Sequence, residues 1–247
     1  MKRILFSIGL SLLAFTSNAQ MTATEIIDNY FENIGGREAW SALKGHKITA
    51  EINMGMVLPI DMYMMKDGRS RISFKLQGQE MVQEAFDGES VWSTNFASMT
   101  NEKADTEESE NRKRSIGEYP DPFLNVKEGG FTAEYIGEET VEGVKCYKVK
   151  LIKKPILVDG IETENSDFYY FDQENFVPIM TESVIHSGPA KGKTALSVFS
   201  DYQEVDGLYF PFSITYKTKS EEGQTIEIKS IELNPAVTDE LFDFPGE

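Results

Sequence analysis

Residues able to perform acid–base, nucleophilic or metal chemistry are scarce and scattered in this sequence. Histidine occurs only at His46 and His186, and cysteine only at Cys146. No Cys/His cluster has zinc spacing, no Gly-x-Ser-x-Gly elbow surrounds a serine, and no glycine-rich loop has the spacing that cradles a phosphate. The sequence therefore predicts a non-enzymatic protein with no catalytic residue, no metal site and no cofactor.

Carboxylates are the exception, because the chain carries 41 acidic residues against 24 basic ones. A pair at glycosidase distance stays open, although their abundance makes any chosen pair arbitrary. A hydrolase using carboxylates or serine-rich loops is thus a third hypothesis. Residues 172–175 could resemble a calcium loop, but they lack its glycine and fit a hairpin turn better. This negative charge makes nucleic acid a poor partner.

The beginning of the chain has the pattern of an export signal. A basic start at Lys2 and Arg3 precedes an apolar run over residues 4–15, and small residues lead up to Ala19. We expect residues 1–19 to be a signal peptide and residues 20–247 to form a single periplasmic domain. Gln20 in place of cysteine predicts no lipid anchor, and no later apolar run is long enough to span a membrane.

Methionines gather in one segment, where residues 54–65 hold five of the ten. Leu58, Ile60, Met62 and Met64 alternate with other residues, which places them on one face of a β-strand. Methionine side chains are flexible and polarizable, so such a face can adapt to an apolar ligand of variable shape. Taken alone, the cluster favours the simpler interpretation of methionine as filler in an ordinary sheet core.

The elements around this segment predict a mainly β (α+β) fold. Thr22 and Glu25 form a capping-box pattern before an amphipathic helix that ends at Gly35-Gly36. About ten to eleven strands follow with short turns, many of them Asp-Gly or Glu-Gly, as in an antiparallel meander. Prolines near strand starts favour edges or bulges, so we expect a half-open antiparallel β-barrel rather than a closed one.

One segment interrupts the strands. Residues 101–118 form an acidic arm without an apolar stripe, which favours a solvated helix or a mobile loop. The apolar patch at 119–124, fixed between prolines, follows it. Together they could act as a flap over a cavity, or form a surface excursion that Phe123 and Leu124 pin to the core. The sequence does not decide between the two.

Four segments resemble a known family. They are residues 87–95 (DGESVWSTN), 119–125 (YPDPFLN), 201–212 (DYQEVDGLYFPF) and 233–244 (LNPAVTDELFDF). With the capped helix and the antiparallel sheet, they are similar to the LolA/LolB-like superfamily of outer-membrane lipoprotein carriers, and most to the outer-membrane lipoprotein-sorting protein type common in Bacteroidetes. The resemblance implies a half-barrel whose concave apolar face is covered by helical segments and holds acyl chains.

The resemblance and the strand pattern together imply a function and a site. We expect a non-enzymatic carrier or binder of lipid or lipoprotein acyl chains, or else an envelope protein-interaction module whose groove is filled and holds no lipid. The lid arginine of the family corresponds to Arg69, with Phe123 and Leu124 as further lid residues. The predicted lining is Met56, Leu58, Ile60, Met62, Met64, Phe74, Trp92, Phe168, Tyr170, Phe210, Phe212, Ile214 and Tyr216.

Overall fold

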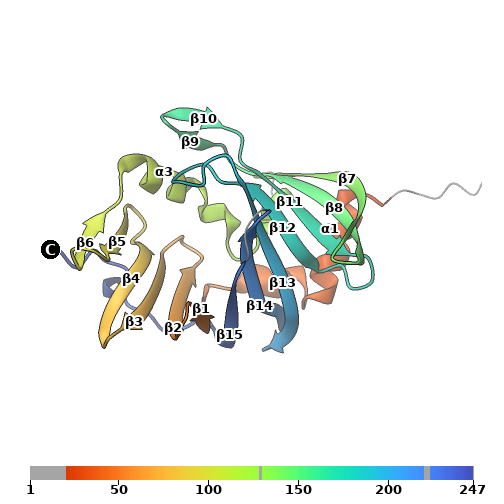
Figure 1. Ribbon diagram of the computed structural model, residues 1–247. Helices are drawn as coiled ribbons and strands as arrows, with labels where there is room; N and C mark the ends of the chain where they lie inside the picture. Colours follow the sequence, from red (N-terminus) through yellow and green to blue (C-terminus); the bar gives the residue numbers. More distant parts are fainter. Residues whose placement is uncertain (1–20, 128–129, 220–222, 247) are drawn as a thin grey trace, which may run out of the picture.

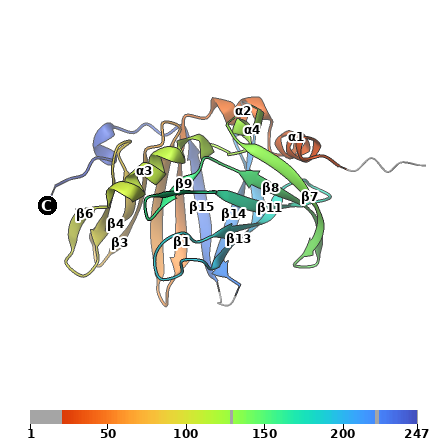
Figure 2. The same cartoon turned by 90° about the horizontal axis from the view of Figure 1, so that it is seen from above.

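A curled antiparallel sheet dominates the computed structural model of the protein (Figure 1). The structure describes residues 21–127, 130–219 and 223–246, so the predicted signal peptide lies outside the described residues. Helices gather along one end of the sheet, and hairpin turns form the opposite end (Figure 2).

Helix α1 (Ala23–Asn33) begins where the sequence predicts. The Oγ1 of Thr22 accepts a hydrogen bond from the backbone N–H of Glu25 at 3.2 Å, and the Glu25 carboxylate accepts one from the backbone N–H of Thr22 at 2.8 Å. This reciprocal capping satisfies two N–H groups that the helix itself cannot pair. Gly35 and Gly36, both with positive φ, then turn the chain into α2 (Arg37–Ala42).

Fifteen strands occur among the described residues, more than the ten to eleven predicted. They are β1 (Gly45–Asn53), β2 (Val57–Met65), β3 (Ser70–Leu76), β4 (Gln79–Phe86), β5 (Val91–Asn95), β6 (Thr100–Lys103), β7 (Thr132–Val141), β8 (Val144–Ile152), β9 (Ile156–Val158), β10 (Ile161–Thr163), β11 (Ser166–Asp172), β12 (Pro178–Val184), β13 (Thr194–Val205), β14 (Leu208–Thr218) and β15 (Gln224–Leu233).

The undercount has a physical cause. Strands β9 and β10 are three residues long and form a separate two-stranded hairpin, too short for alternation to be visible. Strand β6 has the sequence Thr-Asn-Glu-Lys, which carries no apolar residue, and it lies at the edge of the large sheet. Backbone pairing alone defines these strands.

The large sheet is open. Its thirteen strands follow the order β6-β5-β4-β3-β2-β1-β15-β14-β13-β12-β11-β8-β7, and within the described chain β6 and β7 do not pair with each other. Every neighbouring pair is antiparallel. The predicted half-open architecture is therefore confirmed, with more strands than expected.

The acidic arm forms a helix that is bound to the separate β9–β10 hairpin. Helix α3 (Thr106–Arg114) is capped by Asp105 and is followed by the 3-10 turn η1 (Ile116–Glu118). Asn111 hydrogen-bonds both backbone groups of Leu157, at 2.7 and 2.8 Å, and Glu107 accepts from the backbone N–H of Gly160 at 2.6 Å. Polar contacts thus tie α3 to the β9–β10 hairpin (Figure 1).

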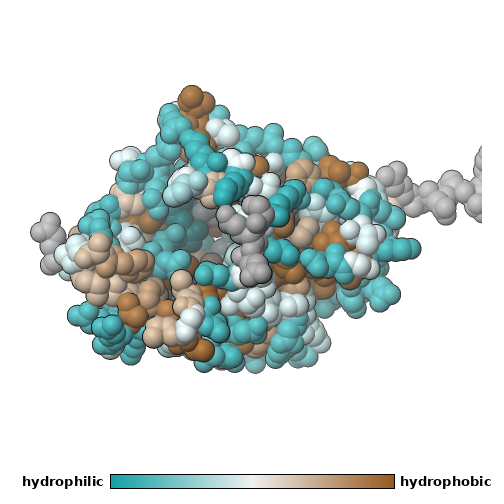
Figure 3. All heavy atoms as spheres, viewed as in Figure 1, coloured by the Kyte–Doolittle hydropathy of each residue, from teal (hydrophilic) through white to brown (hydrophobic). Residues whose placement is uncertain are grey.

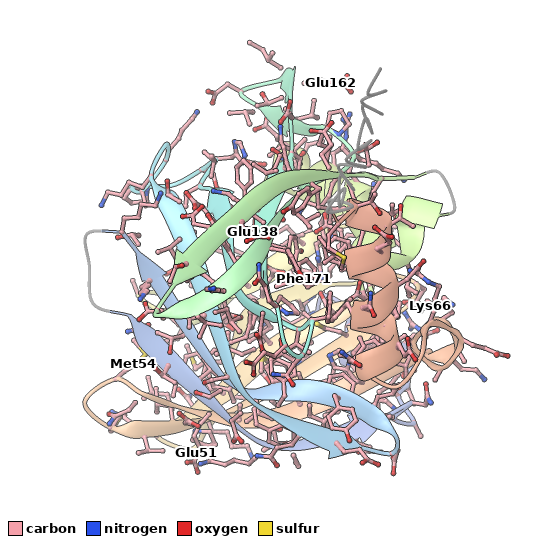
Figure 4. The ribbon with its side chains drawn as sticks, turned by 90° about the vertical axis from the view of Figure 1, so that its right-hand side faces the viewer. Glu51, Met54, Lys66, Glu138, Glu162 and Phe171 are labelled. Carbon is pink, nitrogen blue, oxygen red and sulfur yellow. The ribbon has the colours of Figure 1, made fainter. Side chains whose placement is uncertain are left out.

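Helices and aromatic side chains close one end of the half-barrel. Phe123 lies just before α4 (Leu124–Lys127), and its ring centroid is 4.7 Å from that of Tyr169 and 5.5 Å from that of Phe171. Phe171 is fully buried, in the interior behind β7 and β8 (Figure 4). The buried face of α1 and the side chain of Trp40 belong to the same cluster.

The C-terminal segment covers the other face of the sheet. The indole N–H of Trp92 donates to the backbone carbonyl of Phe242 at 2.8 Å, and Arg71 donates to that of Leu241 at 2.8 Å. Both carbonyls lie in or directly after the turn η2 (Asp239–Leu241). The residue pairs Arg71–Ala85 and Ala85–Trp92 place these side chains on one face of β3, β4 and β5.

Candidate functional site

Strand register identifies the concave face. On β1 and β2, His46 pairs with Met64, Ile48 with Met62, Ala50 with Ile60 and Ile52 with Leu58, so these side chains point to one side. The imidazole of His46 lies 5.3 Å from the ring of Tyr119 and 6.1 Å from that of Phe210, inside the closed end. The face that carries Met64 is therefore the inner one.

An apolar hollow of about 250 Å³ lies on this face, at the end away from the helices. Its lining comes from β1, β2, β3, β4 and β15 and the β5–β6 turn, and it carries no charged side chain: Ile52, Met54, Leu58, Ile60, Phe74, Gln83, Phe96 and Gln224. Figure 4 shows Met54 at the tip of the β1–β2 hairpin, far from Lys66 at its other end. Figure 3 shows the surface recessed below the β9–β10 hairpin.

A second hollow of about 250 Å³ lies at the opposite end of β2, beneath α3 and η1. His46, Met64, Arg112 and Tyr119 are among its lining residues. The Nδ1 of His46 is 3.2 Å from the hydroxyl of Tyr119, while its buried Nε2 has no partner among the described residues. Burial lowers the pKa of His46 to about 4, so its ring is neutral at pH 7.

Met62 connects the two hollows. It pairs with Ile48 on one side and Ile72 on the other, and all three side chains are half-buried. The run from Leu58 to Met64 spans about 20 Å at roughly 3.3 Å per residue. The inner face of β1–β3 thus presents an apolar strip between the hollows.

The remainder of the interior is filled. Asp121 is buried between α1 and the sheet, where the Tyr30 hydroxyl donates to its carboxylate at 2.6 Å and the backbone N–H of Phe123 donates at 2.8 Å. Burial raises the pKa of Asp121 to about 6 despite these two donors and the nearby charge of Arg37. The interior therefore combines a packed half with a partly hollow one.

The structure brings most of the predicted lining residues to the inner face. Residues 214 and 226 pair on β14 and β15, and Ile226 pairs in turn with Ile52. Period-two alternation along β14 then places its other candidates on the same side. The predicted residues on the inner face are Leu58, Ile60, Met62, Met64, Phe74, Phe210, Phe212, Ile214 and Tyr216.

Three predicted lining residues lie on the wrong side of the sheet. Trp92 is on the outer face beneath the C-terminal segment. Phe168 and Tyr170 pack with Met180 and Leu196 in a separate outer cluster, because their register neighbours Tyr169 and Phe171 point inward. Alternation along a strand separates its two faces but does not show which face is concave. Choosing the neighbouring residue as the inward one therefore moves every side chain of the strand to the opposite face.

Met56 lies away from the hollow, because it is 57% exposed at the tip of the β1–β2 hairpin. Arg69 is among the residues that line the second hollow, and its ion pairs with Asp67 and Asp239 hold the C-terminal segment. Phe123 and Leu124 belong to the buried cluster around α1.

Several residues of the strip and the apolar hollow were not predicted, among them Ile48, Ile52 and Phe96. Ile48 and Ile52 alternate within the first strand, but this pattern alone does not distinguish a lining residue from a core residue. Phe96 lies in the turn after a strand, where side chains do not alternate, so no sequence pattern marks it. Gln224 reaches the hollow only because β15, the last strand of the chain, pairs with the first. That pairing joins residues too distant in sequence for a local pattern to show.

The fold and the inner face define a class of mainly β proteins with an open, curled antiparallel sheet and helices at its concave side. Three solved structures share this fold across 90–91% of the chain. A LolA superfamily protein from Nitrosomonas europaea has a TM-score of 0.55 and 13% identity, with 99% of that chain covered. A DUF1329 family protein from Desulfovibrio piger has a TM-score of 0.56 and 15% identity, with 97% covered.

The third structure is a domain described as an outer membrane lipoprotein-sorting protein, from Vibrio parahaemolyticus. Its TM-score is 0.52 at 8% identity, with 96% of that chain covered. The resemblance to the LolA superfamily is therefore confirmed at the level of the fold. A family model described as "Uncharacterized protein" matches residues 125–244, and no curated protein sequence matches the chain.

Two searches of the described residues bear on partners and ions. None of their helices has both the length and the apolar composition required to cross a membrane. In the same part of the chain, no three His, Cys, Asp or Glu side chains gather in an arrangement that could hold a metal ion.

Proposed function

We propose that the protein is a periplasmic, non-enzymatic carrier or binder of lipid or lipoprotein acyl chains. The observation that carries this proposal is the uncharged hollow bounded by Leu58, Ile60 and Phe74, which continues along Met62 toward Met64. The fold shared with a LolA superfamily protein and a lipoprotein-sorting domain supports it. The predicted signal peptide supports the location.

The size of the hollow suits a hydrocarbon tail. The hollow of about 250 Å³ can take part of such a tail. Burial contributes about 0.8 kcal/mol per methylene, or about 13 kcal/mol for a chain of roughly sixteen, before the costs of association. The apolar strip along Met62, about 20 Å long from Leu58 to Met64, offers a surface for the rest of a chain of roughly sixteen carbons. Micromolar binding is within reach without a charged contact.

Native mass spectrometry of the purified protein, with organic extraction of what co-purifies, tests the proposal. We expect a hydrophobic adduct that a Leu58→Trp substitution reduces, because the larger side chain fills the hollow. Val184→Trp is the matched control, since Val184 is 51% exposed at the end of β12. A protein that carries no lipid and gains none from added fatty acid or lipoprotein would refute the proposal.

A second candidate function has its own supporting observation. The interior around Phe123, Tyr169 and Phe171 is packed solid, as expected for an envelope protein-interaction module with a filled groove. Crosslinking in cells distinguishes the two functions. A trapped protein partner with no extractable lipid would favour the interaction module.

A further inference from the structure

Three neighbouring hairpin tips of this acidic protein carry no charge. About one residue in four of the chain is charged, yet residues 52–60, 76–79 and 90–101 contain none. These segments form the β1–β2, β3–β4 and β5–β6 turns, which lie at the same end of the sheet because consecutive antiparallel strands alternate in direction (Figure 2).

Large apolar side chains project from two of these tips. Their exposed fractions are 58% for Met54, 57% for Met56, 59% for Val57, 56% for Phe96 and 47% for Met99. We call these five residues the apolar rim. Exposing these apolar side chains to water costs free energy, and monomeric proteins rarely keep such a surface unless it binds a partner.

The rim is continuous with the apolar hollow. Met54 and Phe96 belong to both, and the ring centroid of Phe96 is 5.9 Å from that of Phe74 on the inner face of β3. The polar side chains of the tips are engaged locally, because Asn53 accepts from the N–H of Gly55 and Asn95 from that of Ala97. The outward surface of the rim therefore consists of methionine, valine and phenylalanine side chains.

We propose that the apolar rim docks on the uncharged, zwitterionic surface of a lipid bilayer. Methionine and phenylalanine at separate hairpin tips enter the headgroup boundary individually, as amphipathic anchors do. A second copy of the chain is disfavoured, because each copy carries a formal charge of −17. Charged groups, which steer the encounter between two proteins and set its specificity, are absent from the tips. Anionic lipid repels the acidic body of the protein.

Docking in this orientation presents the mouth of the hollow to the hydrocarbon of the membrane. An acyl chain could then move between bilayer and hollow without crossing water, a consequence that rests on the proposed function. The docking itself does not require a bound lipid. The two proposals can therefore fail separately.

Vesicle flotation with phosphatidylcholine tests the docking with the purified protein. We expect measurable partitioning that Met56→Asp and Phe96→Asp each weaken about tenfold or more, because a charge replaces a buried apolar side chain. Ile161→Asp is the matched control, since Ile161 is 69% exposed at the separate β9–β10 hairpin. Equal losses in all three variants, or no partitioning of the unsubstituted protein, would overturn the proposal.

A fluorescent variant measures insertion directly. Met56→Trp should shift its emission to shorter wavelength on phosphatidylcholine vesicles and be quenched by lipids brominated near the headgroup. Ile161→Trp should show neither effect. Partitioning that is stronger on phosphatidylglycerol vesicles would contradict the role assigned to the uncharged rim. Rim docking without any extractable lipid would refute the carrier function and leave the docking intact.

Discussion

Two buried titratable groups should give this protein opposing pH dependences of stability. The pKa of His46 is lowered to about 4 from 6.5, because burial penalises its charged form. The pKa of Asp121 is raised to about 6 from 3.8 for the same reason. Both side chains are more than nine-tenths buried, so the full shifts enter the free energy of unfolding.

The two contributions to stability have opposite pH dependences because histidine is charged when it is protonated, whereas aspartate is charged when it is deprotonated. Between pH 4 and 6.5 the unfolded chain holds a proton on His46 that the folded chain lacks, so this contribution to stability rises with pH. Between pH 3.8 and 6 the folded chain holds a proton on Asp121 that the unfolded chain has lost, so this contribution falls as pH rises. At 1.36 kcal/mol per pKa unit each contribution is about 3 kcal/mol, and they nearly cancel.

Single substitutions separate the two contributions. Relative to the unsubstituted protein, His46→Gln should lose stability progressively as the pH rises from 4 to 6.5, and Asp121→Asn should gain stability between pH 4 and 6, each by about 3 kcal/mol. Urea unfolding followed by the fluorescence of Trp40 and Trp92 measures both. Other carboxylates contribute equally to all three proteins and drop out of the difference. Differences that stay constant with pH, or change in the same direction, would refute this reasoning.

Three further predictions concern packing, capping and the α3 bridge. Phe123→Ala removes a ring that contacts three other rings in the closed end, so thermal unfolding should show a loss of about 3–5 kcal/mol. A loss below about 1 kcal/mol would show that the cluster is not packed as described. Thr22→Ala breaks the capping box and should lower the free energy of unfolding, measured with urea, by about 1 kcal/mol, whereas Thr22→Ser should leave it nearly unchanged. Equal losses in the two variants would contradict the capping role. Asn111→Ala removes both hydrogen bonds to Leu157, so hydrogen exchange should accelerate at the Leu157 amide while the β1–β15 ladder keeps its protection. Equal acceleration at all amides would refute a local role for Asn111.

Local sequence chemistry predicted much of the fold. The capping pattern at Thr22 and Glu25 fixed the start of α1, because it depends on residues three apart. Turns at Gly68, Gly88 and Gly207 were predictable, since each needs a residue that tolerates positive φ, which they adopt at 97°, 105° and 85°. Strands with clear alternation were likewise recognisable, whereas β6, β9 and β10 lacked it.

The site was only partly predictable. Alternation grouped Leu58, Ile60, Met62 and Met64 correctly, because side chains two residues apart share a face whatever the fold. It could not distinguish the inner from the outer face, and so it placed Trp92 and Tyr170 in the cavity. The burial of Trp92 depends on the C-terminal segment, about 150 residues later in the chain.

The sequence by itself determined the class of the fold and the absence of charge around the methionine strand, because periodicity, turn chemistry and composition are local properties. Tertiary structure alone decided where the hollow lies and how much of the interior is filled. The reason is geometric: the last strand pairs with the first, the sheet curls, and α1 and Phe123 occupy one end while the hairpin tips leave the other open.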